Sequence, residues 1–270
     1  MTNLFDLSGK VAVVTGAGLG IGKQIALGFA AHGADIVGCD INDEAMAEAQ
    51  AEIVALGRKA EFIHADIGNP DDIDTLFELV DCSFGRVDIL VNNVGIGARH
   101  RPEDLPLAAF ERVLEVGVIG TLNCSQQAGR RMIAAGRGGS IINISSIASA
   151  AALGRGNLAH SANKGAINML TKEMAIEWAH HGIRVNAILP CQVLTEGFQK
   201  WLDSPTFDQA LMDRFLVGIP MNRLAQAEDM AGPAIFLASD AAAMVTGTLL
   251  AVDGGNLALN AGGSHTWLTA

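Results

Sequence analysis

A glycine-rich segment early in the chain constrains the fold more than any other feature. Residues 15–22 read TGAGLGIG, follow the apolar run at residues 11–14, and open a segment in which Ile21, Ile25 and Phe29 recur every four residues. A β-type run, a glycine turn and a helical period predict a strand, a tight turn and an amphipathic helix. Glycines let the backbone approach a pyrophosphate, whose charge the helix N-terminus stabilises. We therefore expect a nucleotide-binding βαβ unit here.

The alternation of strand and helix patterns continues along the chain. Further β-type runs at residues 37–40, 89–91 and 141–144 are separated by amphipathic segments long enough for helices. This order predicts an α/β fold of the Rossmann type, doubly wound, with a seven-stranded, mostly parallel sheet and helices on both faces.

No repeat or Pro/Ser-rich linker divides the chain, so we expect one domain over residues 1–270. Residues 196–218 are rich in Phe and Trp and are expected to form a lid over a substrate, although packing of an amphipathic helix would explain them too. Residues 256–270, with Trp267 and Leu268, form a C-terminal tail that could cover a neighbouring subunit's pocket.

Composition excludes several classes of partner. The net charge of −11 argues against nucleic acid and anionic membranes, which require concentrated Lys and Arg. No export signal and no apolar run long enough to span a membrane is visible, so a cytoplasmic protein is expected. The four cysteines form no CxxC pair, and we expect neither a disulfide framework nor a metal site.

An acidic residue accompanies the glycine segment at the spacing a dinucleotide requires. Asp40 ends the predicted second strand, some 20 residues downstream, where a carboxylate can accept hydrogen bonds from a ribose diol. A carboxylate there also repels a 2′-phosphate, which favours NAD over NADP. The alternative is a tight glycine turn with a solvated aspartate at a strand end.

Further motifs follow in a recognisable order. They are Asp66, the NNVG at residues 92–95, Ser145-Ser146, Lys164, the RVN at residues 184–186, Pro190 with Thr195, and the VDGG at residues 252–255. With the TGxxxGxG spacing, they make the chain resemble the short-chain dehydrogenase/reductase family from about residue 8 to 256. The resemblance implies hydride transfer between NAD(P) and an alcohol or carbonyl of a small molecule.

The resemblance also implies a cofactor site. Asp66 and Ile67 would flank the adenine, Lys164 would hold the nicotinamide ribose, and Leu19 stands where NADP-preferring relatives often carry Arg. Asp66 could instead cap a strand end. The full expected set is Gly16, Gly18, Leu19, Gly20, Ile21, Gly22, Asp40, Ile41, Asp66, Ile67, Asn93, Lys164, Pro190, Val193 and Thr195.

The expected catalytic residues depart from the family pattern. Family members use an Asn-Ser-Tyr-Lys tetrad, of which only Ser146 and Lys164 match here. His160 stands at the tyrosine position, Gly117 stands at the asparagine position, and the chain contains no tyrosine. The resemblance therefore predicts Ser146, His160 and Lys164 as the catalytic set, with His160 as a modified acid/base.

Three interpretations of His160 stay open at this point. Its position four residues before Lys164 puts both side chains on one face of a helix, and a neighbouring cation disfavours imidazolium. A neutral imidazole suits general-base oxidation of an alcohol. The alternatives are a non-redox reaction, such as hydrolysis or proton abstraction beside a carbonyl, and a catalytically silent NAD-binding subunit or sensor.

Several residues near the expected cleft are candidates for substrate binding: Arg99, Arg101, Arg155, Asn157 and Cys191. Arginines match carboxylates or phosphates, although such a run is often simply solvated. The thiol is more readily explained as a small apolar filler. These polar groups favour a polyol, sugar or hydroxy acid. The resemblance further implies a homotetramer assembled through long helices near residues 105–131 and 157–179 and through the last strand.

Overall fold

The computed structural model describes residues 3–205 and 207–260. These residues form a seven-stranded sheet in the order β3-β2-β1-β4-β5-β6-β9, with every adjacent pair parallel. The predicted Rossmann-type α/β fold is confirmed. The strands are β1 (Val11–Thr15), β2 (Asp35–Asp40), β3 (Ala60–His64), β4 (Ile89–Asn92), β5 (Gly139–Ile144), β6 (Ile183–Pro190) and β9 (Leu249–Val252), and a separate small sheet pairs β7 (Val193–Leu194) with β8 (Ala225–Gln226).

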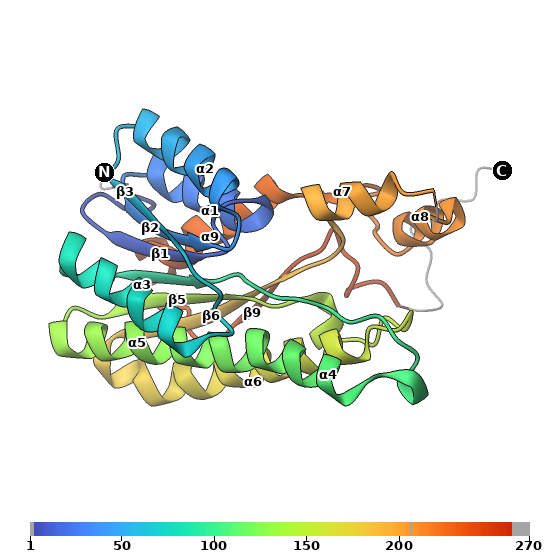
Figure 1. Ribbon diagram of the computed structural model, residues 1–270. Coiled ribbons are helices and arrows are strands. Elements are labelled where there is room, and N and C mark those ends of the chain that lie inside the picture. The colour runs from blue at the N-terminus through green and yellow to red at the C-terminus, as the bar shows by residue number, and fades with distance from the viewer. Residues whose placement is uncertain (1–2, 206, 261–270) are drawn as a thin grey trace.

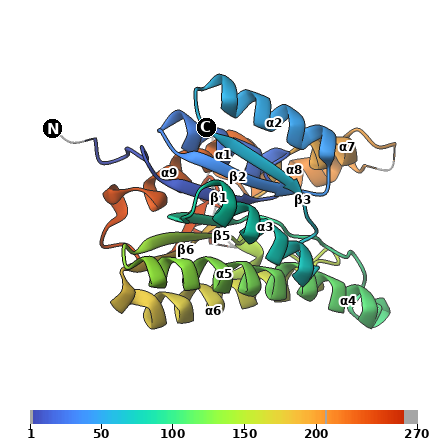
Figure 2. The same cartoon turned by 60° about the vertical axis from the view of Figure 1, so that its left-hand side comes forward.

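Helices cover both faces of the large sheet, as Figures 1 and 2 show. One face carries α1 (Gly20–Ala31), α2 (Asp43–Ala55) and α9 (Ala231–Ala238), and the other carries α3 (Pro70–Ser83), α5 (Gly120–Ala135) and α6 (Leu158–Trp178). Because the strand order reverses between β1 and β4, a crevice is expected outside their carboxyl ends. No helix in the described part of the chain is long and apolar enough to cross a bilayer.

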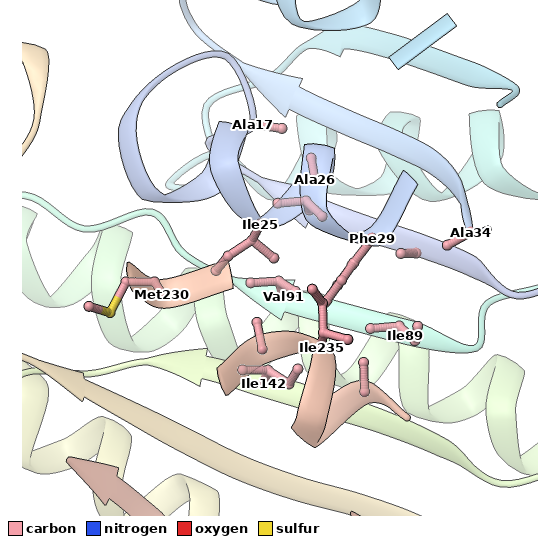
Figure 3. Packing of buried hydrophobic residues seen from close by; sticks show 14 of the residues in the cluster. Ala17, Ile25, Ala26, Phe29, Ala34, Ile89, Val91, Ile142, Met230 and Ile235 are labelled. Carbon is pink, nitrogen blue, oxygen red and sulfur yellow. The ribbon is translucent and has the colours of Figure 1, made fainter. Parts of the chain in front are cut away.

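The first helix is anchored by the apolar stripe that its sequence predicts. Ile25 and Phe29 are completely buried, and Ile21 packs against the same cluster from a partly buried position. Figure 3 shows Phe29 directed toward Ile235 of α9, between the helices and the sheet. Burial of side chains of this size stabilises the fold by roughly 1.5–3 kcal/mol each, which fixes the N-terminus of α1 beside β1.

The long helix expected over residues 105–131 is interrupted. It begins as α4 (Leu107–Leu114), passes through a π-helical turn at Glu115–Ile119, and continues as α5. Gly117 lies inside that turn and is buried. π-Turns within helices are often found at functional sites, and this one faces the neighbouring α6.

The segment after β6 forms two short helices, α7 (Glu196–Leu202) and α8 (Gln209–Val217), beyond the carboxyl end of the sheet (Figure 1). Trp201 is at their centre, with its ring centroid 4.8 Å from that of Phe207, 5.3 Å from Phe198 and 6.4 Å from Phe215. The aromatic residues noted in the sequence therefore pack mainly on one another. Of the expected C-terminal tail, residues 261–270, including Trp267 and Leu268, lie outside the described residues.

Candidate active site

The glycine segment forms a tight turn that only glycine permits at its last position. A β-carbon on Gly22 would overlap the backbone oxygen of Gly16, which has a left-handed φ of +65°. Helix α1 starts immediately after Leu19, whose side chain gives no capping hydrogen bond. By contrast, Asn42 caps α2 and Asn69 caps α3. The first-turn amides of α1 thus fit a pyrophosphate, because no side chain among residues 3–205 and 207–260 accepts a hydrogen bond from them.

Asp40 lies across this turn at the end of β2. Its Oδ2 accepts a hydrogen bond from the Gly18 amide at 3.1 Å, and its Oδ1 accepts from the amides of Ile41 and Asn42 at 2.8 and 3.2 Å. These bonds fix the carboxylate beside the glycine turn, where a ribose diol would reach it. Ile41, also expected at the cofactor, is 66% exposed beside it.

Asp66 has protein partners that the sequence did not predict. It accepts a hydrogen bond from the Gly68 amide at 2.8 Å and forms an ion pair with Arg112 of α4. Burial alone would raise the pKa of Asp66, but the bonds from Gly68 and Arg112 lower it overall. Asp66 therefore stabilises a turn locally, as the capping alternative supposes, while Ile67 is buried behind it.

Asn93 joins the end of β4 to the glycine turn. Its Nδ2 donates to the backbone oxygens of Thr15 and Gly16 at 3.0 and 3.2 Å, and its amide donates to the Thr15 hydroxyl at 3.0 Å. The Asn93 side chain consequently links the end of β4 to the glycine turn, because its carboxamide hydrogens bind backbone oxygens of that turn.

The three expected catalytic residues converge from β5 and α6. Ser146 follows β5, and its hydroxyl oxygen accepts from the Ala148 amide at 3.1 Å, which leaves the hydroxyl proton available to a substrate oxygen. His160 lies one helical turn before Lys164 on α6. Lys164 is buried, and its Nζ donates to the backbone oxygen of Ile144 at 2.6 Å. Gly95 leaves room for this ammonium group, since a β-carbon at residue 95 would lie 3.1 Å from the Lys164 Nζ.

Burial shapes the protonation of both basic groups. It lowers the pKa of Lys164 to about 8. Burial, followed by the charges of Lys164 and Arg99, lowers the pKa of His160 to about 4. The pKa of His160 is therefore lowered, as the sequence predicts, but burial contributes more to the lowering than the charge of Lys164. Above about pH 5 the imidazole is neutral and able to accept a proton.

Ser146 and His160 lie on the wall of a cavity of about 450 Å³, which α7 and α8 border on the far side. Four of the expected substrate residues also line it: Arg99, Arg155, Asn157 and Cys191. Arg101 lies outside this lining set, exposed at the start of a short 3₁₀ turn. Burial raises the pKa of the Cys191 thiol, which favours its interpretation as an apolar filler over a nucleophile.

The last three expected cofactor residues lie at the end of β6, in β7 and at the start of α7. Pro190 ends β6 beside Val252, and Val193 is buried in the small sheet opposite Ala225. Thr195 caps α7 by accepting from the Phe198 amide at 3.3 Å. Its Cγ2 would be 3.1 Å from a β-carbon on Gly20, so α7 begins in contact with the glycine turn.

Comparison with known proteins identifies the family of this chain. The family model described as Enoyl-(Acyl carrier protein) reductase matches residues 16–256. The chain belongs to the short-chain dehydrogenase/reductase family. It is an oxidoreductase of that family, whose members bind nicotinamide cofactors.

Three of the similar proteins are named for small polyhydroxy compounds. D-threitol dehydrogenase of Mycolicibacterium smegmatis is 41% identical over 93% of this chain and 94% of that protein. 2-Dehydro-3-deoxy-D-gluconate 5-dehydrogenase of Escherichia coli is 38% identical over 94% of this chain and 98% of that protein. The crystal structure of gluconate 5-dehydrogenase from Burkholderia cenocepacia in complex with NADP and tartrate matches with a TM-score of 0.88 and 35% identity, covering 95% of this chain and 98% of that one.

One buried residue of this short-chain dehydrogenase escaped the sequence analysis. Asn163 is completely buried on α6, and its side chain occupies the space into which a β-carbon on Gly117 would project. Neither atom of its carboxamide has a hydrogen-bond partner among the described residues. The sequence offered a hint, since Asn163 directly precedes Lys164, but only the packing of α6 against the π-turn brings it to Gly117.

A buried network of polar side chains, which the sequence did not reveal, supports the strands and helices that carry the site. The Asn92 Nδ2 donates to the Asn143 Oδ1 at 2.8 Å and to the Ser125 hydroxyl at 3.0 Å, and the Asn143 Nδ2 donates to the Thr171 hydroxyl at 2.8 Å. All four residues are buried. The network joins β4, β5, α5 and α6, and so fixes the elements that carry Ser146 and Lys164.

Proposed function

We propose that the protein is an NAD-dependent dehydrogenase that transfers hydride between NAD and a small polar alcohol or carbonyl, with His160 as its acid/base. The observation that carries the proposal is the convergence of Ser146 and His160 on one cavity wall, one helical turn from the buried Lys164. The activities named for similar proteins support a polyol, sugar or hydroxy acid as the substrate class.

The roles of the side chains follow from their protonation. Ser146 donates its free hydroxyl proton to the substrate oxygen and orients it. His160, neutral at physiological pH because burial lowers its pKa to about 4, accepts the hydroxyl proton as the alcohol is oxidised. Lys164 holds the nicotinamide ribose, and NAD⁺ when bound accepts the hydride. An imidazole reaches roughly 2 Å less far than a phenol, so the substrate must sit deeper or a water must bridge.

NAD preference is the second part of the proposal. It is supported by the fixed carboxylate of Asp40 beside the glycine turn, which would repel a 2′-phosphate. The exposed Leu19 at the same turn offers no positive charge. Lys23, in the first turns of α1, is engaged by Glu52 at 2.8 Å. A 2′-phosphate would therefore meet the Asp40 anion, while the lysine of α1 is already paired with Glu52.

We further propose that residues 196–218 act as a lid. Helices α7 and α8 supply one side of the cavity through Phe198, Leu211 and Phe215. Thr195 links the start of α7 to the glycine turn, so a cofactor bound at the turn would affect the position of α7. Closing this wall would exclude water from His160 and Ser146.

Assembly into a homotetramer is proposed through the face formed by α4, the π-turn and α6. Each of these elements exposes large apolar side chains: Leu107 at 76%, Ile119 at 57%, Met169 at 55% and Ile176 at 75%. Where such side chains form one continuous patch, the patch marks a contact surface. Sedimentation equilibrium would give a tetramer mass for the wild type and a smaller species for Ile176→Glu.

The test of the catalytic proposal is NADH formation, followed by absorbance, when the purified protein is given NAD⁺ with a panel of polyols, sugars and hydroxy acids. We expect turnover that His160→Ala lowers by roughly 10²–10⁴-fold while NAD⁺ affinity is kept. Tight NAD⁺ binding without turnover would contradict the dehydrogenase and favour a silent subunit or a non-redox reaction. Activity raised by His160→Tyr would indicate a degraded family member.

A further inference from the structure

The cavity beside His160 carries an excess of positive charge in an otherwise acidic protein. Arg99, Arg155 and Arg214 all line it, although the chain has a net charge of −11. None of the three takes part in an ion pair within the described residues. Asp208, the carboxylate on the same wall, accepts a hydrogen bond from the Ala210 amide and lies beyond ion-pair distance of them.

Backbone contacts bring together the loops that carry two of these arginines. The His100 amide donates to the Gly156 oxygen at 3.3 Å, and a β-carbon on Gly156 would lie 2.9 Å from the His100 oxygen. This contact brings the loop after β4 against the loop after β5, so Arg99 and Arg155 become neighbours. Burial, followed by the charge of Arg99, lowers the pKa of Arg155. The two positively charged side chains therefore repel each other in the folded protein.

The backbone of Arg155 is itself in an unfavourable conformation. Its φ is +60°, and the flanking Gly154 and Gly156 also have positive φ values of +67° and +74°. A left-handed conformation costs a non-glycine residue of order 1–3 kcal/mol and tends to persist where function requires it. Here it directs the guanidinium over the ring of Phe215, 4.7 Å from the ring centroid.

Arg99 and Arg155 are each stacked on an aromatic ring in a way that leaves their N–H donors free. The Arg99 guanidinium carbon lies 4.5 Å from the ring centroid of Trp201 on α7, and Arg155 lies over Phe215 on α8. Stacking uses the face of the guanidinium and leaves the in-plane N–H groups free for an acceptor. The same N–H fork matches the two oxygens of a carboxylate.

We propose that Arg99 and Arg155 bind a carboxylate group of the substrate, so that the enzyme acts on a small hydroxy acid and not on a neutral polyol. This inference rests on the proposed function for its reaction, but not for its binding site. The carboxylate offsets the repulsion between the two cations while a hydroxyl of the same molecule reaches Ser146 and His160. Because Trp201 and Phe215 belong to α7 and α8, a bound carboxylate also stabilises the position of these two helices beside the cavity.

The test is equilibrium binding to the protein saturated with NAD⁺, followed by tryptophan fluorescence at constant ionic strength, because Trp201 stacks on Arg99. Two matched pairs of probes differ only in replacing terminal CH₂OH groups by carboxylates: D-gluconate against D-glucitol, and tartrate against threitol. We expect the acid of at least one pair to bind tenfold or more tightly than its polyol. Arg99→Gln and Arg155→Gln should each weaken acid binding by about 10–100-fold and change polyol binding less than twofold.

Arg101→Gln is the matched control, because it removes one positive charge two residues from Arg99 but outside the cavity lining. It should leave acid binding within twofold of wild type. Equal affinity for acid and polyol in both pairs would overturn the proposal, as would an equal loss in Arg101→Gln. Selective acid binding without NADH formation would contradict the dehydrogenase and leave the anion site standing, whereas turnover without acid selectivity would do the reverse.

Discussion

The side chain of Asn163 fills the space that a β-carbon on Gly117 would need. The two residues lie on different helices and meet where the π-turn packs against α6. A side chain larger than hydrogen at residue 117 therefore requires Asn163 to move. The glycine and the buried asparagine form a matched pair next to Lys164.

Replacing this glycine tests the pairing. Gly117→Asn should destabilise the protein by roughly 1–3 kcal/mol, because it overpacks a buried contact. The double variant Gly117→Asn/Asn163→Ser should recover most of that loss, which corresponds to a coupling above about 0.5 kcal/mol. Denaturant unfolding of the four proteins in the cycle measures it. Equal costs of Gly117→Asn with and without Asn163 would show that the contact does not set the penalty.

The pH dependence of alcohol oxidation should reflect two lowered pKa values. We expect the rate to be level from about pH 5 to 7, to fall below that range as His160, with a pKa of about 4, takes up a proton, and to fall above about pH 8 as Lys164 loses its charge. An ordinary imidazole, with a pKa near 6.5, would instead give a rising limb inside the level range. Rates at saturating NAD⁺ distinguish these profiles, and His160→Tyr should move the lower limb upward.

Cofactor choice should reverse when the charge beside the glycine turn reverses. Leu19→Arg/Asp40→Ala removes the carboxylate and adds a cation, so NAD⁺ affinity should fall and NADP⁺ affinity should rise, each by about tenfold or more. Calorimetric titration of both cofactors measures the change. Asp43→Asn is the matched control, because Asp43 carries the same charge on the following helix but pairs with His64 at 2.8 Å. An unchanged preference in the double variant would contradict the role of Asp40.

The buried ammonium group of Lys164 should lower the free energy of unfolding while it contributes to cofactor binding. Lys164→Met removes a buried ammonium while keeping its bulk, and should raise the free energy of unfolding at pH 7 by roughly 1–3 kcal/mol while weakening NAD⁺ binding. The folded-state pKa of about 8 lies below the ordinary 10.5, so the unfolded chain holds more protons between those values. Wild-type stability should therefore rise relative to the variant as pH increases from about 8 to 10.5. A constant difference across that window would contradict a buried, titrating lysine.

Much of the nucleotide half could be predicted because its signals are local. The apolar run, the glycine turn and the stripe of Ile25 and Phe29 each act within a few residues of one another, and the structure has a strand, turn and helix there. The interruption at Gly117 could not be predicted in the same way. A helical period continues across residues 107–135, and the π-turn appears only where that helix packs on α6.

The substrate side shows the same division. From the sequence, Arg99, Arg155 and Cys191 are candidates for substrate binding, and so is Arg101. All four follow predicted strands, and the sequence shows only that distance along the chain. The contact between His100 and Gly156 decides which of these side chains share a cavity. Arg214 joins them from α8 without any signal in its own neighbourhood.

The sequence by itself determined the glycine turn, the carboxylate that follows it, and the histidine and lysine on one helical face, because each depends on spacing along a single strand, turn or helix. Only the tertiary structure decided how Asn163 meets Gly117, how burial lowers the pKa values of His160 and Lys164, and how two arginines are held together against their repulsion. Those features depend on the exclusion of water and on packing between segments distant in the chain. No local pattern of residues encodes such contacts.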